Sequence, residues 1–227
     1  MTGLFDSWQR QINYLRISVT DRCNFNCVYC AGGSDASALR SVELSYEEIR
    51  RIVEVAAGMG ITKLRLTGGE PLLRPNLSRL VGMLAQVDGI KAISLTTNGM
   101  FLSKYAPELK KAGLKRVNVS LDTLQADKFK RITGSDQLKE VLAGIEATRL
   151  AGLTPVKINV VVLRGINDDE IIDFARLTIS QGWHVRFIEF MPFGALRNEV
   201  GEMVSAEEIQ ESIQSLGHLE PDVGEGG

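Results

Sequence analysis

The segment of the sequence that decides the fold reads Tyr14-Leu-Arg-Ile-Ser-Val-Thr20-Asp-Arg-Cys23-Asn-Phe-Asn-Cys27-Val-Tyr-Cys30. Its first part alternates between polar and apolar side chains, and successive side chains of a strand point to opposite faces. Residues 14–20 are therefore predicted to form a strand with one polar and one apolar face. Three cysteines follow directly, so any site that they form is expected at the end of that strand.

Outward from this strand, five further short segments alternate in the same way. They are residues 63–67, 92–97, 116–122, 156–163 and 185–191. Segments with helical spacing separate them, at residues 45–58, 76–86, 102–111, 135–151 and 168–180, and a last helix is expected from Ser205. Ser45 and Ser205 each precede a glutamate by three residues, which is the spacing of a helix capping box. Gly60, Gly113 and Gly152 lie just beyond three of these segments, as expected of helix ends.

The regular succession of strands and helices predicts an α/β fold. An antiparallel sheet with one face in water would also explain the polar faces, but it predicts hairpins. About 20 to 45 residues separate these strands, which is the length that parallel crossovers require. A closed eight-stranded barrel fills its interior with Val, Ile and Leu. A polar interior therefore predicts an incomplete TIM-type barrel of six β/α units, (β/α)6, around a polar ligand.

The overall charge excludes some classes of partner. The 227 residues carry 26 Lys and Arg against 28 Asp and Glu, and 44% of them are hydrophobic. This near balance gives no overall field for nucleic acid or an anionic membrane, so an anion site must be local. No apolar run approaches the ~20 residues of a membrane span, and the N-terminus lacks the pattern of a signal peptide. We therefore expect a cytoplasmic protein whose cysteines are reduced.

The cysteines have the spacing C-x3-C-x2-C, which allows three kinds of site. Zinc usually takes four ligands, and the fourth would have to be His184 or His218, far away in sequence. A redox pair would use Cys27 and Cys30 and would leave Cys23 unexplained. Three thiolates also suit a four-iron cluster whose fourth iron is open to a small molecule.

Cations are predicted on the polar face of three different strands. Arg16, Arg65 and Lys157 all fall on this face by alternation. A charge on an enclosed face is costly unless an opposite charge compensates it, and a phosphate ligand would do so. The alternative is an internal ion-pair network with Asp122 and Glu189.

The cysteine spacing, with an aromatic residue before the third cysteine and a strand before the first, resembles the radical S-adenosylmethionine (SAM) enzymes. Further motifs resemble, in the same order, the GTP 3′,8-cyclase family of molybdenum cofactor biosynthesis, over about residues 4–215. Besides the first segment, these motifs are Thr67-Gly-Gly-Glu-Pro71, Thr96-Thr-Asn-Gly99, Asn118-Val-Ser-Leu-Asp122, Lys157-Ile-Asn-Val160, Gly165-Ile-Asn167 and Phe187-Ile-Glu-Phe-Met-Pro192. The resemblance implies the partial barrel of radical SAM enzymes.

The resemblance also implies the chemistry and the partners. A reduced [4Fe–4S] cluster cleaves SAM, and the resulting 5′-deoxyadenosyl radical takes the 3′ hydrogen of the ribose of GTP. The ribose radical then attacks C8 of guanine to give (8S)-3′,8-cyclo-7,8-dihydroguanosine 5′-triphosphate. The cluster and SAM are the implied cofactors, GTP is the implied substrate, and flavodoxin or ferredoxin is the implied kind of electron donor. The family leaves room for a homodimer.

The family's roles carry over to matching positions of this chain. The implied cluster ligands are Cys23, Cys27 and Cys30. The positions that match cofactor contacts are Tyr29, Gly69, Ser120 and Met191. The positions that match GTP contacts are Arg16, Arg65, Thr96 and Lys157, with Lys63 as a weaker addition. No side chain receives a catalytic role, because the radical arises from the cofactors.

The sequence departs from the family after the cluster motif and near its end. The family usually continues with Met-Pro, whereas Ala-Gly-Gly follows Cys30, and no cysteine of a second cluster follows later. We expect residues 1–195 to form the partial barrel and residues 196–227 to form a linker and a helix leading to a missing C-terminal cluster region. A truncated gene or an incomplete sequence is the favoured interpretation. Two alternatives remain, namely another radical SAM enzyme acting on a peptide or small molecule, and a non-catalytic iron–sulfur module.

Overall fold

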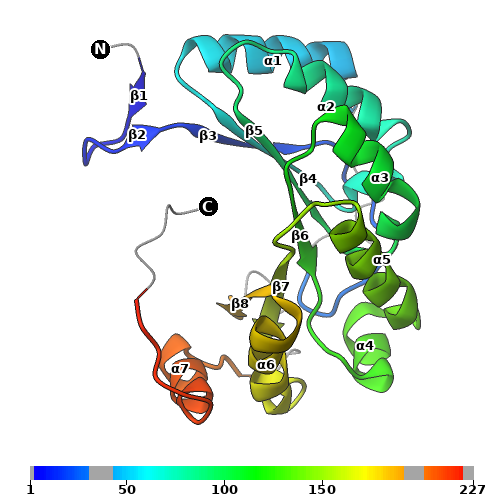
Figure 1. Cartoon of the computed structure of the whole chain (residues 1–227), viewed down its shortest axis with the longest axis vertical. Helices are drawn as coiled ribbons and strands as arrows, with labels where there is room; N and C mark the ends of the chain where they lie inside the picture. Colours follow the sequence, from blue (N-terminus) through cyan, green and yellow to red (C-terminus); the bar gives the residue numbers. More distant parts are fainter. Residues whose placement is uncertain (1–2, 31–42, 192–201, 222–227) are drawn as a thin grey trace.

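A six-stranded parallel sheet organises the chain in the computed structural model, which describes residues 3–30, 43–191 and 202–221 (Figure 1). The strands follow the order of the chain, and every neighbouring pair is parallel. They are β3 Tyr14–Ser18, β4 Lys63–Thr67, β5 Ala92–Thr97, β6 Arg116–Ser120, β7 Lys157–Val162 and β8 His184–Glu189. This topology confirms the six-unit partial barrel and excludes the antiparallel alternative.

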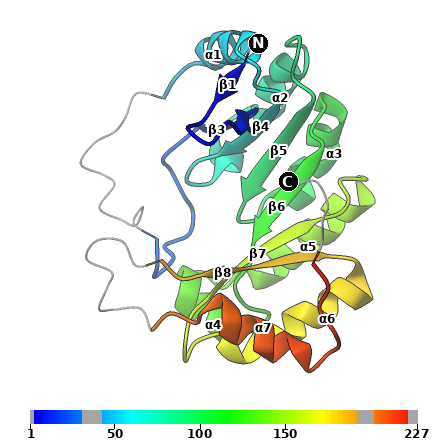
Figure 2. The ribbon, with the colours of Figure 1, turned by 90° about the vertical axis from the view of Figure 1, so that its left-hand side faces the viewer.

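Helices connect the strands and cover the outer side of the sheet. Figure 1 shows α1, α2, α3 and α5 along one side of the strands, and Figure 2 views the strands from the other side. The helices are α1 Tyr46–Gly58, α2 Leu77–Ala85, α3 Leu102–Ala112, α4 Ala126–Thr133, α5 Leu138–Leu150, α6 Ile171–Gln181 and α7 Ala206–Gln214. Two 3-10 turns, η2 Pro71–Leu73 and η3 Asp168–Glu170, follow β4 and β7.

The predicted helix signals are found at their expected positions. The hydroxyl groups of Ser45 and Ser205 accept from the backbone N–H groups of Glu48 and Glu208, whose carboxylates accept in return from the two serine N–H groups. Both capping boxes are therefore confirmed. Gly113 ends α3 with φ of 112°, in the left-handed region that favours glycine.

Three short elements differ from the expectation. A hairpin of β1 Leu4–Phe5 and β2 Gln11–Ile12 precedes the sheet, and strands of two residues show no alternation. Helix α4 was not predicted, because it has eight residues and its first cap, Gln125, makes no side-chain capping bond. The predicted helix over 168–180 is η3 followed by α6.

The core lies between the apolar strand faces and the helices. Leu66, Leu95, Val117 and Ile158 of four neighbouring strands are each 0% exposed. Ile209 of α7 belongs to the same core. The predicted boundary between the barrel and the C-terminal linker, at residues 195–196, lies outside the described residues. No helix of the described segments is long and apolar enough to cross a membrane.

Candidate active site

The end of α4 anchors the cysteine loop, residues 23–30. The backbone N–H groups of Asn26 and Val28 donate to carbonyl groups of the last turn of α4, each over 2.9 Å. The ring of Phe25 meets the ring of Phe129 edge-on, with 5.6 Å between the ring centroids. A helix that the sequence did not reveal therefore holds the cysteine loop. The departure from the family after Cys30 lies outside the described residues.

The three thiols are close enough to influence one another. Cys27 is half-buried, whereas Cys23 and Cys30 are exposed. Burial above all, together with the carboxylate of Asp122 and the two other thiols, raises the pKa of the Cys27 thiol to about 12. Burial also raises the pKa of Cys23. Because the irons of a cluster supply the positive charge that stabilises thiolates, this donor set suits a cluster and is a poor nucleophile without one.

A single zinc ion fits these residues less well than a cluster. Within the described residues, no three cysteine, histidine or carboxylate side chains converge where one metal ion could bind. His184 begins β8 and pairs with Lys157, so it lies at the end of the sheet opposite to the cysteine loop. In a cluster each thiolate binds a different iron, so the three sulfur atoms need not meet at one point.

Tyr29, between Cys27 and Cys30, is bound to the end of β6. Its hydroxyl group donates to Asp122 Oδ2 over 2.5 Å, and Asp122 Oδ1 accepts from the Val161 N–H over 2.8 Å. Burial raises the pKa of Asp122 to about 6 and raises the pKa of Tyr29 well above its usual value. Asp122 therefore binds Tyr29, a predicted cofactor contact, and does not pair with a cation of the inner face.

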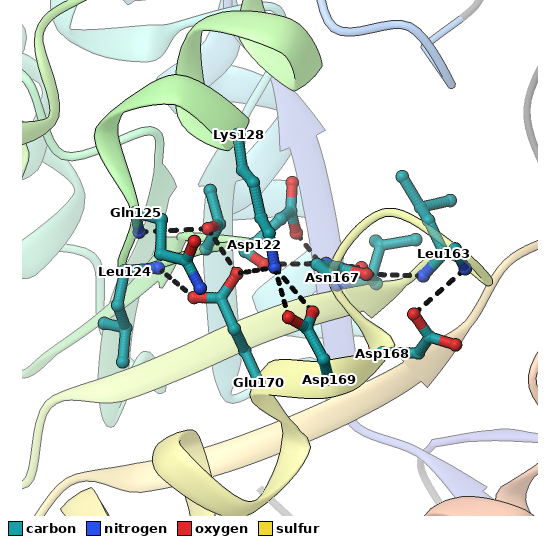
Figure 3. Close-up of polar contacts among 12 residues, drawn as sticks. Asp122, Leu124, Gln125, Lys128, Leu163, Asn167, Asp168, Asp169 and Glu170 are labelled. Carbon is teal, nitrogen blue, oxygen red and sulfur yellow. Dashed lines mark hydrogen bonds and ion pairs between the residues drawn. The ribbon is translucent and has the colours of Figure 1, made fainter.

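Hydrogen bonds and an ion pair connect the loops that follow β6 and β7, next to Asp122 (Figure 3). Asn167 donates from Nδ2 to the carbonyl oxygen of Asp122 over 2.6 Å. The buried Glu170 accepts from the N–H of Leu124 over 2.7 Å and lies 3.1 Å from the ammonium group of Lys128, on α4. These bonds fix α4 relative to the sheet, and with it the cysteine loop.

The glycine pair after β4 allows two chain segments to approach each other closely. A Cβ atom on Gly69 would lie 2.2 Å from the carbonyl oxygen of Arg22, so only glycine fits there. The next residue, Glu70, is 0% exposed and accepts from two backbone N–H groups and from the Thr97 hydroxyl. Glu70 therefore joins the carboxyl ends of β4 and β5.

The polar face of the sheet forms rows, because the parallel strands hold their residues in register. The first row is Arg16, Arg65, Ser94 and Arg116. The second row is Thr96, Asn118, Lys157 and His184. The third row is Ser120, Asn159 and Arg186. A cavity of about 280 Å³ lies on this face, and its lining includes Tyr14, Lys63, Arg65, Arg116, Asn118 and Lys157.

Within the described residues, three cations of this face have no acidic partner. Among the residues that the structure describes, Arg16, Arg65 and Lys157 form no ion pair. Burial lowers the pKa of Arg65 and of Lys157, and nearby cations lower both further. The alternative network is not found in the described part of the chain, where Asp122 binds Tyr29 and Glu189 accepts from the backbone N–H of Ala206.

Unpartnered buried atoms gather on the same face. The buried side-chain oxygens without a hydrogen-bond partner in the described residues belong to Tyr14, Thr96, Asn118 and Asn159. Because buried polar atoms are normally hydrogen-bonded, this face is suited to a polar ligand. The sequence reasoning assigned only Thr96 to a ligand. It also missed Arg186, which shares a row with Asn159 and which alternation along β8 could have revealed.

The predicted cofactor and substrate contacts occupy two levels of the sheet. Tyr29 and Gly69 follow β3 and β4, Ser120 ends β6, and Met191, which is 60% exposed, follows β8. Because parallel strands end at one edge, these four residues share the carboxyl edge with the cysteine loop. The predicted GTP contacts lie on the inner face below that edge.

Comparison with known proteins identifies the family. The Radical SAM superfamily matches residues 17–178. The chain belongs to the radical SAM superfamily. It is 53% identical over 218 residues to a GTP 3′,8-cyclase of Moorella thermoacetica, covering 95% of this chain and 67% of the relative. It is 48% identical over 219 residues to the GTP 3′,8-cyclase of Thermodesulfovibrio yellowstonii, covering 95% and 68%. This radical SAM protein therefore also belongs to the family of these cyclases.

Two solved structures show the same fold. Streptococcus suis SuiB bound to S-adenosylmethionine has a TM-score of 0.76 and 17% identity, over 90% of this chain and 47% of that one. HydG, a maturase of the [FeFe]-hydrogenase, has a TM-score of 0.71 and 17% identity, over 88% and 48%. A [4Fe–4S] cluster and SAM are the cofactors of this family, and the thiols of the cysteine loop suit the cluster.

Proposed function

We propose that this chain is a GTP 3′,8-cyclase that uses radical SAM chemistry. The observation that carries the proposal is a set of inner-face cations, Arg16, Arg65 and Lys157, that form no ion pair within the described part of the chain. They lie directly below an edge that bears three thiols. The cations suit a triphosphate, because arginine and lysine bind phosphate oxygens through charged N–H groups. A relative that is 53% identical to this chain is a GTP 3′,8-cyclase, which supports GTP as the substrate.

In this proposal, each group of residues has one role. The cluster ligands are Cys23, Cys27 and Cys30. The contacts of SAM are Tyr29, Gly69, Ser120 and Met191. The contacts of GTP are Arg16, Arg65, Thr96 and Lys157, with Lys63 and Arg186 as further cations on the same face.

The division of work between cofactors and chain follows from these roles. When bound, the cluster and SAM supply a carbon radical that removes a hydrogen atom from the substrate, with an electron from a donor such as flavodoxin or ferredoxin. Arg65 and Lys157 bind the phosphates and thereby fix the nucleotide on the inner face. The hydrogen bond of Tyr29 to Asp122 holds one wall of the cofactor site in a single orientation.

Deuterium transfer tests the proposed reaction. The anaerobically reconstituted chain is given SAM, a strong reductant and GTP deuterated at the ribose 3′ carbon. Mass spectrometry is expected to detect deuterium in 5′-deoxyadenosine, whereas GTP deuterated at C8 is the control that gives none. Transfer from an added peptide but not from GTP would assign the chain to another radical SAM reaction. Cofactor binding without any cleavage would favour the non-catalytic iron–sulfur module.

A further inference from the structure

Asn118 has a free hydrogen-bond acceptor in the middle of the inner face. Its side chain is 1% exposed and lines the cavity of about 280 Å³. Its Nδ2 donates to the carbonyl oxygen of Leu95 over 3.3 Å, while its Oδ1 has no partner among the described residues. Since a carbonyl group can only accept, this bond fixes the amide orientation and leaves the oxygen as the free atom. Oδ1 of Asn159, in the next row, is free as well.

The register places these two acceptors among the residues proposed to contact the nucleotide. Asn118 pairs with Thr96 on one side and with Lys157 on the other. Asn159 pairs with Ser120, a proposed SAM contact, and with Arg186. The acceptors therefore lie between the cation-rich first row and the carboxyl edge with its cysteine loop.

Acceptors and cations select different parts of a nucleotide. The oxygens of a triphosphate at neutral pH accept hydrogen bonds, so they match Arg65 and Lys157 and cannot satisfy an amide oxygen. The donors of a nucleoside triphosphate are the ribose hydroxyl groups and the N–H groups of the base. The ribose is the part adjacent to the phosphates, and the proposed reaction requires it to face the cofactor edge.

We propose that Asn118 and Asn159 recognise the ribose hydroxyl groups of the bound nucleoside triphosphate through their side-chain oxygens. The inference rests on the proposed function and deepens it, because it adds two specificity-determining residues. The cations would then set the affinity for any triphosphate, while the two asparagines would select ribonucleotides over their deoxy analogues. A site built to bind a hydroxyl group rejects an analogue that lacks it, since its buried acceptor is then left unpaired.

Equilibrium binding of nucleotide analogues tests the proposal on the cluster-loaded chain without reductant, so that no turnover occurs. The probes are GTP, 2′-deoxy-GTP, 3′-deoxy-GTP, inosine triphosphate and inorganic tripolyphosphate. We expect the unaltered chain to bind GTP about tenfold more tightly than at least one deoxy analogue, and Asn118→Ala or Asn159→Ala to remove that preference. Tripolyphosphate affinity should change less than about twofold in both variants. Ser94→Ala is the matched control and should keep the preference for the ribose hydroxyl groups. The Ser94 hydroxyl lines the same cavity but already has partners, because it donates to the Leu64 carbonyl and accepts from Arg65 Nε.

Each outcome decides the matter. Equal binding of GTP and both deoxy analogues by the unaltered chain would overturn the ribose assignment without any variant. Variants that keep the hydroxyl preference but lose discrimination against inosine triphosphate would assign the acceptors to the base instead. Failure to bind either GTP or tripolyphosphate would refute the proposed function itself. Should Asn118→Ala not fold, Asn159→Ala and the analogue series decide the question alone.

Discussion

The carboxyl edge of the sheet and its inner face differ in how they treat buried polar groups. At the edge, Glu70, Asp122 and Glu170 are 5% exposed or less, and each accepts at least two hydrogen bonds. On the inner face, Arg65 forms no ion pair and Asn118 Oδ1 no hydrogen bond among the described residues. The edge is thus stabilised by the chain itself, whereas the face is complementary to a ligand. Changes at the edge should therefore alter stability, and changes on the face should alter affinity.

The largest expected effect comes from the cysteine loop, the part of the edge that is proposed to hold the cluster. Cys27→Ala should remove the cluster, because the thiolates of one cluster act as a unit, and SAM cleavage should be abolished. The anaerobically reconstituted chain should hold about four irons and show charge-transfer absorbance, both of which the variant should lose. The fold of the metal-free variant should be unchanged by circular dichroism. One zinc ion per chain without this absorbance would contradict the cluster.

Removing an internal contact of the edge should chiefly reduce stability. Glu70→Ala leaves two backbone N–H groups and the Thr97 hydroxyl without their acceptor. We expect a loss of about 2–4 kcal/mol in the free energy of unfolding, measured with urea. Glu47→Ala is the control, because Glu47 is exposed and its ion pair with Arg79 should contribute less than about 1 kcal/mol. An equal loss of unfolding free energy in both variants would contradict the stabilising role of the buried contacts at the edge.

The inner face could be predicted from the sequence to a large extent, because alternation depends only on backbone geometry. Arg16, Arg65 and Lys157 were assigned to one face without any knowledge of the neighbours, and the register confirms that face. Arg186 lies on the same face and was missed only because the alternation of the last strand was not followed. The prediction that these cations bind GTP stays a prediction.

The support of the cysteine loop could not be predicted in the same way. It depends on α4, a short helix without a side-chain cap, and on bonds between residues far apart in sequence, such as Tyr29 and Asp122. The role of Glu70 was also hidden, since its motif was interpreted as backbone presented to a cofactor. Such contacts depend on tertiary packing, so a local sequence pattern cannot predict them.

The enclosed carboxylate of Asp122 should make stability depend on pH. Its pKa is raised from 3.8 to about 6, so the folded protein above pH 6 must hold a charge that burial disfavours. The group's contribution is therefore fully present below about pH 4 and is lost as the pH rises through about 6. Asp122→Asn should remove this loss, on the order of 2–3 kcal/mol between about pH 4 and pH 7. Urea unfolding at both pH values measures this change in the free energy of unfolding, and Asp127→Asn is the control because Asp127 is exposed. The same pH dependence of stability in the wild type and in Asp122→Asn would contradict the assignment.

The smallest expected effect concerns the cations of the inner face. Lys157→Ala or Arg65→Ala should weaken triphosphate binding about tenfold, since each removes a charge-assisted hydrogen bond to phosphate. Folding should suffer little, because removing one of several neighbouring cations relieves repulsion. Burial is the main cause of the lowered pKa of Lys157, and Arg186, Arg116 and Arg65 lower it further. Lys104→Ala, on the outer helix α3, is the matched control and should leave affinity unchanged.

The same variants separate a ligand site from a structural network. If Arg65 and Lys157 compensated buried carboxylates, deleting either would leave an uncompensated charge and reduce stability by ~3–5 kcal/mol. The edge and the face would then behave alike, and the comparison between them would fail. Thermal unfolding together with tripolyphosphate affinity distinguishes the two cases, since loss of affinity at constant stability is expected only of a phosphate site. Loss of stability at constant affinity would instead make the inner face a second stabilising network like the edge.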